Sequence, residues 1–156
     1  MNALVKIASN EHKLQDLLNK LKQNKGGIKI GFLPGSKYPD GTPVAKVAVI
    51  QEFGTSDIPP RPFLYPTVEK HRAKWVDKLG EALRLNDYDG KKALNVIGMI
   101  AVGDVKDAIK AVTTPPLKES SIKARNRQYK TKSKNTSTKP LIDTGQMLNS
   151  VEFEVT

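Results

Sequence analysis

The sequence predicts an α+β fold, with a small antiparallel sheet packed on two or three long helices and a long basic flexible arm. Two short stretches, 28–33 and 151–155, alternate apolar and polar residues as half-buried strands do. Between them, 67–85 and 91–112 repeat apolar residues every three or four positions, which is typical of amphipathic helices. A length of 156 residues fits a single domain over 1–156.

The first helix is expected over 10–24. Its apolar stripe consists of Leu14, Leu17, Leu18 and Leu21. Asn10 is a suitable cap for its start, and Gly26-Gly27 would end it. The core of the domain is then expected over 28–112, beginning with the first strand.

A second helix is predicted from Thr42 to Phe53, ahead of a proline-rich loop at 54–62. Thr42 would cap this helix, and Pro43 would occupy its first position, which proline favours. Because the helix is apolar nearly all round, we expect it to be buried against another part of the protein. Gly54 would end it with a positive backbone dihedral.

The two long helices each present one apolar face. In the helix over 67–85 this face consists of Val68, Arg72 (through its aliphatic stem), Trp75, Val76, Leu79 and Leu83. In the helix over 91–112 it consists of Leu94, Ile97, Gly98, Ala101, Val105, Ala108, Ile109 and Val112. The small residues of the second face permit a close approach between helices.

Basic residues concentrate in 113–139, which is expected to be a flexible arm or loop with one short helix starting near Ser120. Between 118 and 139 there is one acidic residue, and the eight basic residues are Lys118, Lys123, Arg125, Arg127, Lys130, Lys132, Lys134 and Lys139. This segment carries +7 of the net charge of +10. Residues 130–139 have no apolar side chain and cannot offset the entropy lost on ordering. The charge favours a polyanion or an acidic protein surface as neighbour.

The C-terminal part, 140–156, is expected to hold a short capped helix and a strand. Asp143 would cap the helix, and Gln146 three residues later would complete a capping box. The strand over 151–155 would pair with 28–33, since both are short and alternating.

No catalytic or metal-binding pattern is visible in the sequence. The chain has no cysteine, which excludes thiolate metal sites, disulfides and cysteine nucleophiles. Its two histidines, His12 and His71, lack a second ligand at helical spacing, so we interpret them as surface residues. Asp87 and Asp89 precede Gly90 in a segment that favours a turn and helix cap over a calcium loop. We therefore expect no enzyme activity and no cofactor, and no apolar run is long enough to span a membrane.

Two blocks of sequence are more specific. The first is Val47-Ala-Val-Ile-Gln-Glu-Phe-Gly-Thr55, followed by Ile58-Pro-Pro-Arg-Pro-Phe-Leu64, and the second is Lys139-Pro-Leu-Ile-Asp-Thr-Gly-Gln-Met-Leu-Asn-Ser-Val151. Their order and spacing resemble the tail-completion and head–tail joining family of tailed bacteriophages, which includes the lambdoid minor tail protein Z type and the Mu-type virion morphogenesis proteins. Met147 replaces a leucine of the family pattern and keeps its volume and apolar character. The resemblance spans about 28–156.

The resemblance implies a non-enzymatic structural protein of the virion that assembles in the host cytoplasm. It would form a ring in the neck or at the head-proximal end of the tail, a hexamer or alternatively a dodecamer. Its partners would be neck, connector or tail-tube proteins, with passing contact to phage DNA. The motif residues expected at the subunit interface are Glu52, Phe53, Gly54, Arg61, Pro62, Phe63, Asp143, Thr144 and Gly145. Arg61 would pair with Glu52 or with a neighbouring subunit, and Phe63 would anchor its loop in the core.

The basic segment leaves a second class of function open. A small nucleic-acid-binding protein would act through 118–139, because clustered lysine and arginine are sufficient for phosphate binding. Only Tyr129 is available there to stack on bases, so the pattern of single-strand binders is weak. On the virion hypothesis the same segment is an assembly arm that docks on an acidic protein surface.

Overall fold

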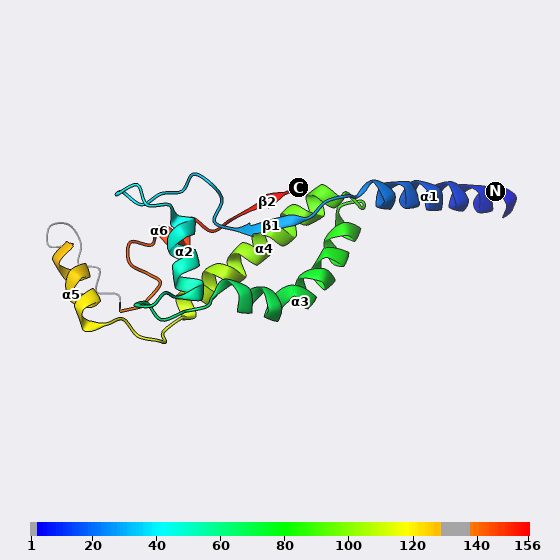
Figure 1. Cartoon of the computed structure of the whole chain (residues 1–156). Coiled ribbons are helices and arrows are strands. Elements are labelled where there is room, and N and C mark those ends of the chain that lie inside the picture. The colour runs from blue at the N-terminus through cyan, green and yellow to red at the C-terminus, as the bar shows by residue number, and fades with distance from the viewer. Residues whose placement is uncertain (1–2, 129–137) are drawn as a thin grey trace.

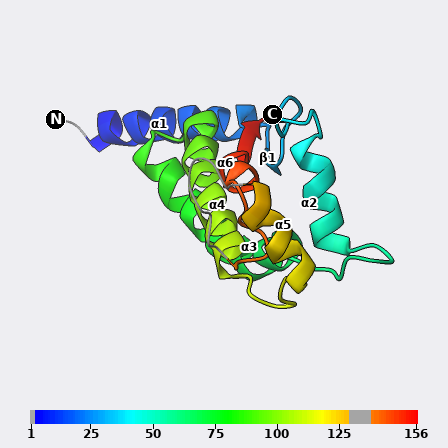
Figure 2. The ribbon, with the colours of Figure 1, turned by 90° about the vertical axis from the view of Figure 1, so that its left-hand side faces the viewer.

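The computed structural model describes residues 3–128 and 138–156. This part of the chain contains six helices and a two-stranded antiparallel sheet, which confirms the predicted α+β class. The elements in chain order are α1 (Ala3–Gln23), β1 (Ile28–Gly31), α2 (Val44–Phe53), α3 (Leu64–Leu85), α4 (Gly90–Ala111), α5 (Glu119–Gln128), α6 (Gln146–Asn149) and β2 (Glu152–Val155). Figure 1 shows α3 and α4 as a long hairpin with the sheet above α4, while α1 projects from one end. Helices α2 and α5 lie at the other end (Figures 1 and 2).

The sheet joins the two strands that the alternation predicts. Ile28 lies opposite Val155, and Ile30 lies opposite Phe153. The ring of Phe153 packs directly on Gly98 of α4, where any side chain would collide with it. The small residue predicted to permit close helix contact therefore lets a strand approach the helix.

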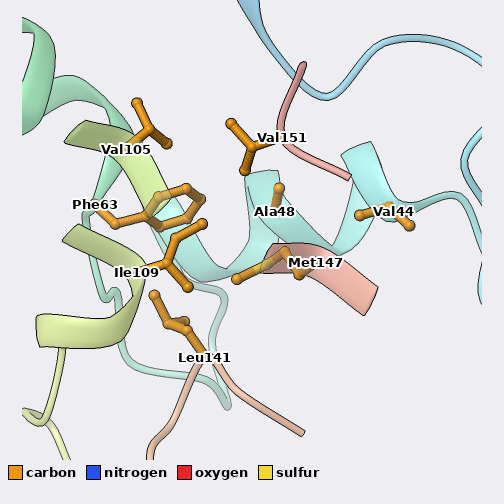
Figure 3. Packing of buried hydrophobic residues seen from close by; sticks show 8 residues of the cluster. All are labelled: Val44, Ala48, Phe63, Val105, Ile109, Leu141, Met147 and Val151. Atoms are coloured by element: carbon orange, nitrogen blue, oxygen red, sulfur yellow. The ribbon is translucent and has the colours of Figure 1, made fainter. Parts of the chain in front are cut away.

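The main hydrophobic core lies where α2, α4 and the C-terminal segment meet (Figure 3). Its buried members are Val44, Ala48, Phe63, Val105, Ile109, Leu141, Met147 and Val151. Phe63 is only 2% exposed and meets Phe32 edge-on, at 6.0 Å between ring centroids, so the predicted anchor of the 54–62 loop is confirmed. A second cluster between α3 and α4 is built on Trp75, Ile97 and Ala101.

Three helix starts differ from the sequence-based expectation. Helix α1 begins at Ala3, so Asn10 lies inside it and does not cap it. Helix α2 begins at Val44 with Pro43 in the capping position, and no side chain caps it. Thr42 is instead part of a turn in which its N–H binds Asp40. Helix α3 begins at Leu64 rather than near 67, because its first N–H groups find an acceptor on α2, as described below.

Helix α2 is buried against the main core as expected, but α2 and α3 both leave apolar side chains exposed. Helix α2 buries only the face carrying Val44, Ala48 and Glu52, whereas Val49 is 57% exposed and Phe53 is 73% exposed. On α3, Val76 is 67% exposed, and Arg72 is exposed beside Glu69 rather than covering the core. Helical periodicity identifies apolar faces, but it does not show which of them the rest of the chain covers.

The starts of α6 and α4 correct one prediction and confirm another. Gly145, with φ 79°, occupies the capping position of α6, and Thr144 Oγ1 accepts the N–H of Gln146 at 3.1 Å. Asp143 makes no capping bond there, so the predicted capping box is wrong. Asp89 does cap α4 by accepting the N–H of Lys92 at 3.0 Å. This N–H holds the pKa of the Asp89 carboxyl below its ordinary value.

Candidate assembly surface

The first motif block builds a rigid junction between α2 and α3. Glu52, in the last turn of α2, is only 8% exposed. Its carboxylate accepts the N–H groups of Phe63, Leu64 and Tyr65 at 2.8, 2.9 and 2.9 Å. These are the N–H groups that a helix start leaves without a partner, and a negative charge is favourable at that end. Helix α2 thus caps α3, and both carboxylate oxygens of Glu52 accept hydrogen bonds from the same chain.

Gly54 supplies the bend between the two helices. Its φ is 76°, so the predicted positive dihedral is confirmed. A Cβ at this position would lie 2.8 Å from the carbonyl oxygen of Ile58 and 2.9 Å from the nitrogen of Pro60. Both obstacles belong to the backbone and cannot rotate away, so the junction requires glycine.

Arg61 fixes the loop that follows Gly54 to a distant segment. It is 4% exposed, and its Nε and Nη2 donate to the carbonyls of Pro115 and Pro116 at 2.8 and 3.1 Å. Its Nη1 donates to Gln51 at 3.2 Å. The expected pair with Glu52 is wrong, because both oxygens of Glu52 already accept backbone N–H groups. Burial lowers the pKa of Arg61, and the positive charge of Arg125 acts in the same direction.

Arg125, on α5, also binds backbone carbonyls of a distant segment, and we call each of these two arginine contacts an arginine clamp. Its Nη1 and Nη2 donate to the carbonyls of Lys139, Pro140 and Ile142 at 3.0 to 3.1 Å. Its Nε lies 3.5 Å from the Asp143 carboxylate. The second motif block is therefore tied to α5, and Asp143 acts as a partner of this arginine. A planar fork with several N–H donors is suited to such a cluster of carbonyls.

The basic segment contains the short helix that was predicted to start near Ser120. Residues 119–128 form α5, and Lys118 and Lys139 donate to the carbonyls of Asp57 and Lys110 at 3.3 and 3.0 Å. Lys123 pairs with Glu119 on α5. The remaining members lie wholly or with their side chains outside the described residues: Arg127, Lys130, Lys132 and Lys134. Three of the basic residues predicted as an assembly arm therefore donate hydrogen bonds to backbone carbonyls of the same chain: Lys118, Arg125 and Lys139.

A shallow groove of about 280 Å³ runs beside the second motif block. Tyr38, Gln51, Arg125 and Asp143 contribute to its walls. Burial raises the pKa of Tyr38, and the charge of Asp143 adds to this rise. The groove carries mixed polar groups and no arrangement of nucleophile and base.

One feature that the sequence did not reveal is an apolar surface at the α2 end of the molecule. We call it the α2 face, and its members are Val49 and Phe53, which lie four residues apart on α2 and are 57% and 73% exposed. Tyr65, in the first turn of α3, is 67% exposed. Within the motif, Phe63 is buried beside Pro62, which is exposed. Only Phe53 of the nine predicted interface residues is a largely exposed hydrophobic side chain.

A second apolar surface lies on α1, at the opposite end (Figure 1). Leu14, Leu18 and Leu21 are 56%, 40% and 41% exposed, and with the partly buried Leu17 they form the α1 stripe. The base of α1 is held by Asn24, which donates to the carbonyl of Tyr88 at 2.8 Å and accepts the N–H of Gly90 at 3.0 Å. The stripe itself was predicted; its lack of cover within the described chain was not.

Within the described residues no group of acidic, histidine or cysteine side chains is arranged to hold a metal ion. In the same part of the chain no helix combines the length and apolar character needed to cross a membrane. Comparisons with protein-family models, with curated proteins and with solved structures gave no match.

Proposed function

We propose that this protein is a structural subunit of a phage virion that forms a ring in the neck or at the head-proximal end of the tail. The observation that carries the proposal is the pair of uncovered apolar surfaces, the α2 face and the α1 stripe, at opposite ends of the molecule. Exposed apolar clusters of this kind are typical of protein–protein interfaces. Two different surfaces at opposite ends suit head-to-tail contacts, which close into rings.

The motif residues support this proposal through their stiffness. Glu52, Gly54, Arg61 and Phe63 hold the end of α2 with buried charge-assisted hydrogen bonds, a glycine bend and a core anchor. Phe53 lies inside this junction and points outward, 73% exposed. A preorganised surface loses little conformational entropy on association. The sequence resemblance to head–tail joining proteins is thus matched by a local structure suited to presenting an interface residue.

A role in nucleic-acid binding is less well supported by the same residues. Lys118, Arg125 and Lys139 donate to backbone carbonyls, and Lys123 pairs with Glu119. A cation that already binds a carbonyl or a carboxylate must give up that contact before it can bind phosphate. Among the described basic residues, fewer are therefore available for phosphate than their charge alone implies.

The test is to locate the protein in assembled particles. Particles produced by a genome that encodes this chain would be purified and labelled with an antibody against it, alongside particles from a genome with the gene inactivated. We expect label at the head–tail junction, and unattached heads or unfinished tails when the gene is inactive. Absence of the protein from purified particles, with normal assembly in the inactivated strain, would overturn the proposal.

A further inference from the structure

The sheet has two open edges. In the described residues β1 pairs only with β2, so each strand has one edge without a neighbouring strand. An open strand edge presents unpaired N–H and C=O groups and is a template for another strand. A ring subunit whose sheet has an open edge on each side can pair one edge with each neighbour, so that a continuous sheet forms between subunits.

The register shows which backbone groups face these edges. Gly27 and Thr156 exchange both hydrogen bonds, N–H to O at 3.1 and 3.0 Å. Bonded pairs alternate along an antiparallel ladder, so Phe153 and Val155 direct their N–H and C=O groups to the open edge of β2. By the same alternation Ile28 and Ile30 direct theirs to the open edge of β1. Each edge thus offers two residues of matching spacing.

Side-chain charge distinguishes between the possible pairings. The exposed face of β2 carries Glu152 and Glu154, whereas the exposed face of β1 carries Lys29. Pairing β2 with β2 of a second copy would place carboxylates side by side, and pairing β1 with β1 would do the same with lysines. Like charges directly opposite each other destabilise a sheet, and opposite charges stabilise it. The favoured contact is therefore between β2 of one copy and β1 of the next.

The inward face agrees with this choice. Ile28, Ile30, Phe153 and Val155 all face the helices of their own chain. Repeating the register of Ile30 opposite Phe153 across the joint keeps apolar residues inward and sets Lys29 beside Glu154. The occupant of each edge is then a second copy of this chain, because each edge carries the charge that the other lacks.

We propose that neighbouring subunits join the open edge of β2 to the open edge of β1 in antiparallel pairing, so that the two-stranded sheet continues from copy to copy. This contact is heterologous and can therefore propagate around a ring. The inference depends on the proposed function for its ring, and adds to it the strands that form the subunit contact.

Disulfide trapping between single-cysteine chains tests the contact, since the native chain has no cysteine. Chains with Lys29→Cys and with Glu154→Cys would be prepared separately and checked to have the melting temperature of the unsubstituted chain. Each would then be oxidised alone and as a mixture. Both side chains are exposed, so the fold is expected to be kept. In the proposed joint these two residues form a non-hydrogen-bonded pair, with Cα atoms about 4.5 Å apart, within the range of a disulfide. We expect covalent dimers as the main product of the mixture only.

The controls separate the alternatives. Asp77→Cys, at an exposed site on α3, should give no dimer with either variant. Dimers from Glu154→Cys alone would indicate β2–β2 pairing and would overturn the proposal, as would a mixture that gives no dimers. The same oxidation applied to assembled particles distinguishes this inference from the proposed function. Particles that contain the protein at the head–tail junction but show no cross-link between 29 and 154 would retain the function and exclude the edge contact.

Discussion

At the scale of single residues, Glu52 in the last turn of α2 caps the start of α3. Its buried carboxylate replaces the solvent that three N–H groups of α3 would otherwise need. A capping residue normally lies just before the helix that it caps, whereas Glu52 lies in a different helix, 11 residues before Phe63. The cap is therefore a tertiary contact, and α2 and α3 cannot separate without exposing it.

Replacement of Glu52 should destabilise the whole domain. In Glu52→Ala the N–H groups of Phe63, Leu64 and Tyr65 lose their acceptor in a buried place, and we expect a loss of about 2 kcal/mol in the free energy of unfolding. Glu52→Gln keeps one acceptor oxygen and should lose less. Urea denaturation measures both. Glu69→Ala, an exposed change on α3, is the matched control and should stay within about 0.5 kcal/mol of the parent. Equal midpoints for Glu52→Ala and the control would contradict the capping role.

Gly54 provides a second residue-scale prediction. Gly54→Ala places a Cβ against the backbone of Ile58 and Pro60 at a positive φ, so we expect a loss of at least about 1–2 kcal/mol. Gly80→Ala is the control, because Gly80 lies within α3 and has open space at its Cβ. That change should raise stability by up to about 1 kcal/mol. Thermal melting of the pair compares them, and a Gly54→Ala variant as stable as its parent would show that the junction can relax.

At the scale of elements, two arginine clamps decide where α5 and the C-terminal segment lie. Arg61 holds the chain that leaves α4, and Arg125 holds the chain that leads to α6. Described residues of α5 have no member in either core cluster, so charge-assisted hydrogen bonds to carbonyls hold this helix in place. In the C-terminal segment the same bonds add to the burial of Leu141, Met147 and Val151 in the main core.

Arg125→Lys should loosen α5 without unfolding the core. A lysine presents a single ammonium group and cannot reach three carbonyls and a carboxylate in one plane. We expect faster amide hydrogen exchange in 119–128 and 140–143, with exchange in α4 unchanged. Lys123→Ala, which removes only an exposed pair with Glu119, is the control and should leave exchange at 140–143 as it was. The clamp would be excluded if Arg125→Lys and the control exchanged alike.

The elements themselves were largely predictable from the sequence, because their signals are local. Alternation identified both strands, and no other stretch offered either of them a partner. The start of α3 was missed because its cap, Glu52, lies 11 residues before Phe63 in another helix. The role of Arg61 was missed because its acceptors lie 54 and 55 residues away. Sequence shows where a charge is, but not which carbonyls will lack a partner once the chain has folded.

The candidate surface was predictable only in part for a related reason. The stripe on α1 and the apolar character of α2 are evident in the sequence, but neither shows which apolar side chains the rest of the chain covers. Whether Leu18 or Phe53 is covered depends on the direction in which each helix leaves the body. That direction is set by Asn24 at the base of α1 and by Glu52 at the end of α2, through contacts with distant backbone groups.

At the scale of the whole molecule, the chain has a compact body and a projecting helix (Figures 1 and 2). The helix hairpin, the sheet and the main core are built from residues that follow α1, and none of the described α1 side chains, at 12–23, belongs to either core cluster. An exposed row of leucines on a projecting helix is costly in water unless a partner covers it. Stability and assembly should therefore be separable in this protein.

Removal of residues 1–18 should abolish assembly and leave the body folded. The deletion takes away Leu14, Leu17 and Leu18 but keeps Asn24 and its contacts with the α3–α4 turn. Because none of the described side chains in the deleted segment belongs to a core cluster, the melting temperature should change by less than about 2 °C. Incorporation into particles should fall to background. In the full-length chain, Leu14→Gln with Leu18→Gln should reproduce the defect, whereas Lys13→Gln with Asp16→Asn, on other faces of α1, should not. A lowered melting temperature for the deletion would mean that α1 packs on the body, and normal incorporation of the double leucine variant would mean that the stripe is not an assembly surface.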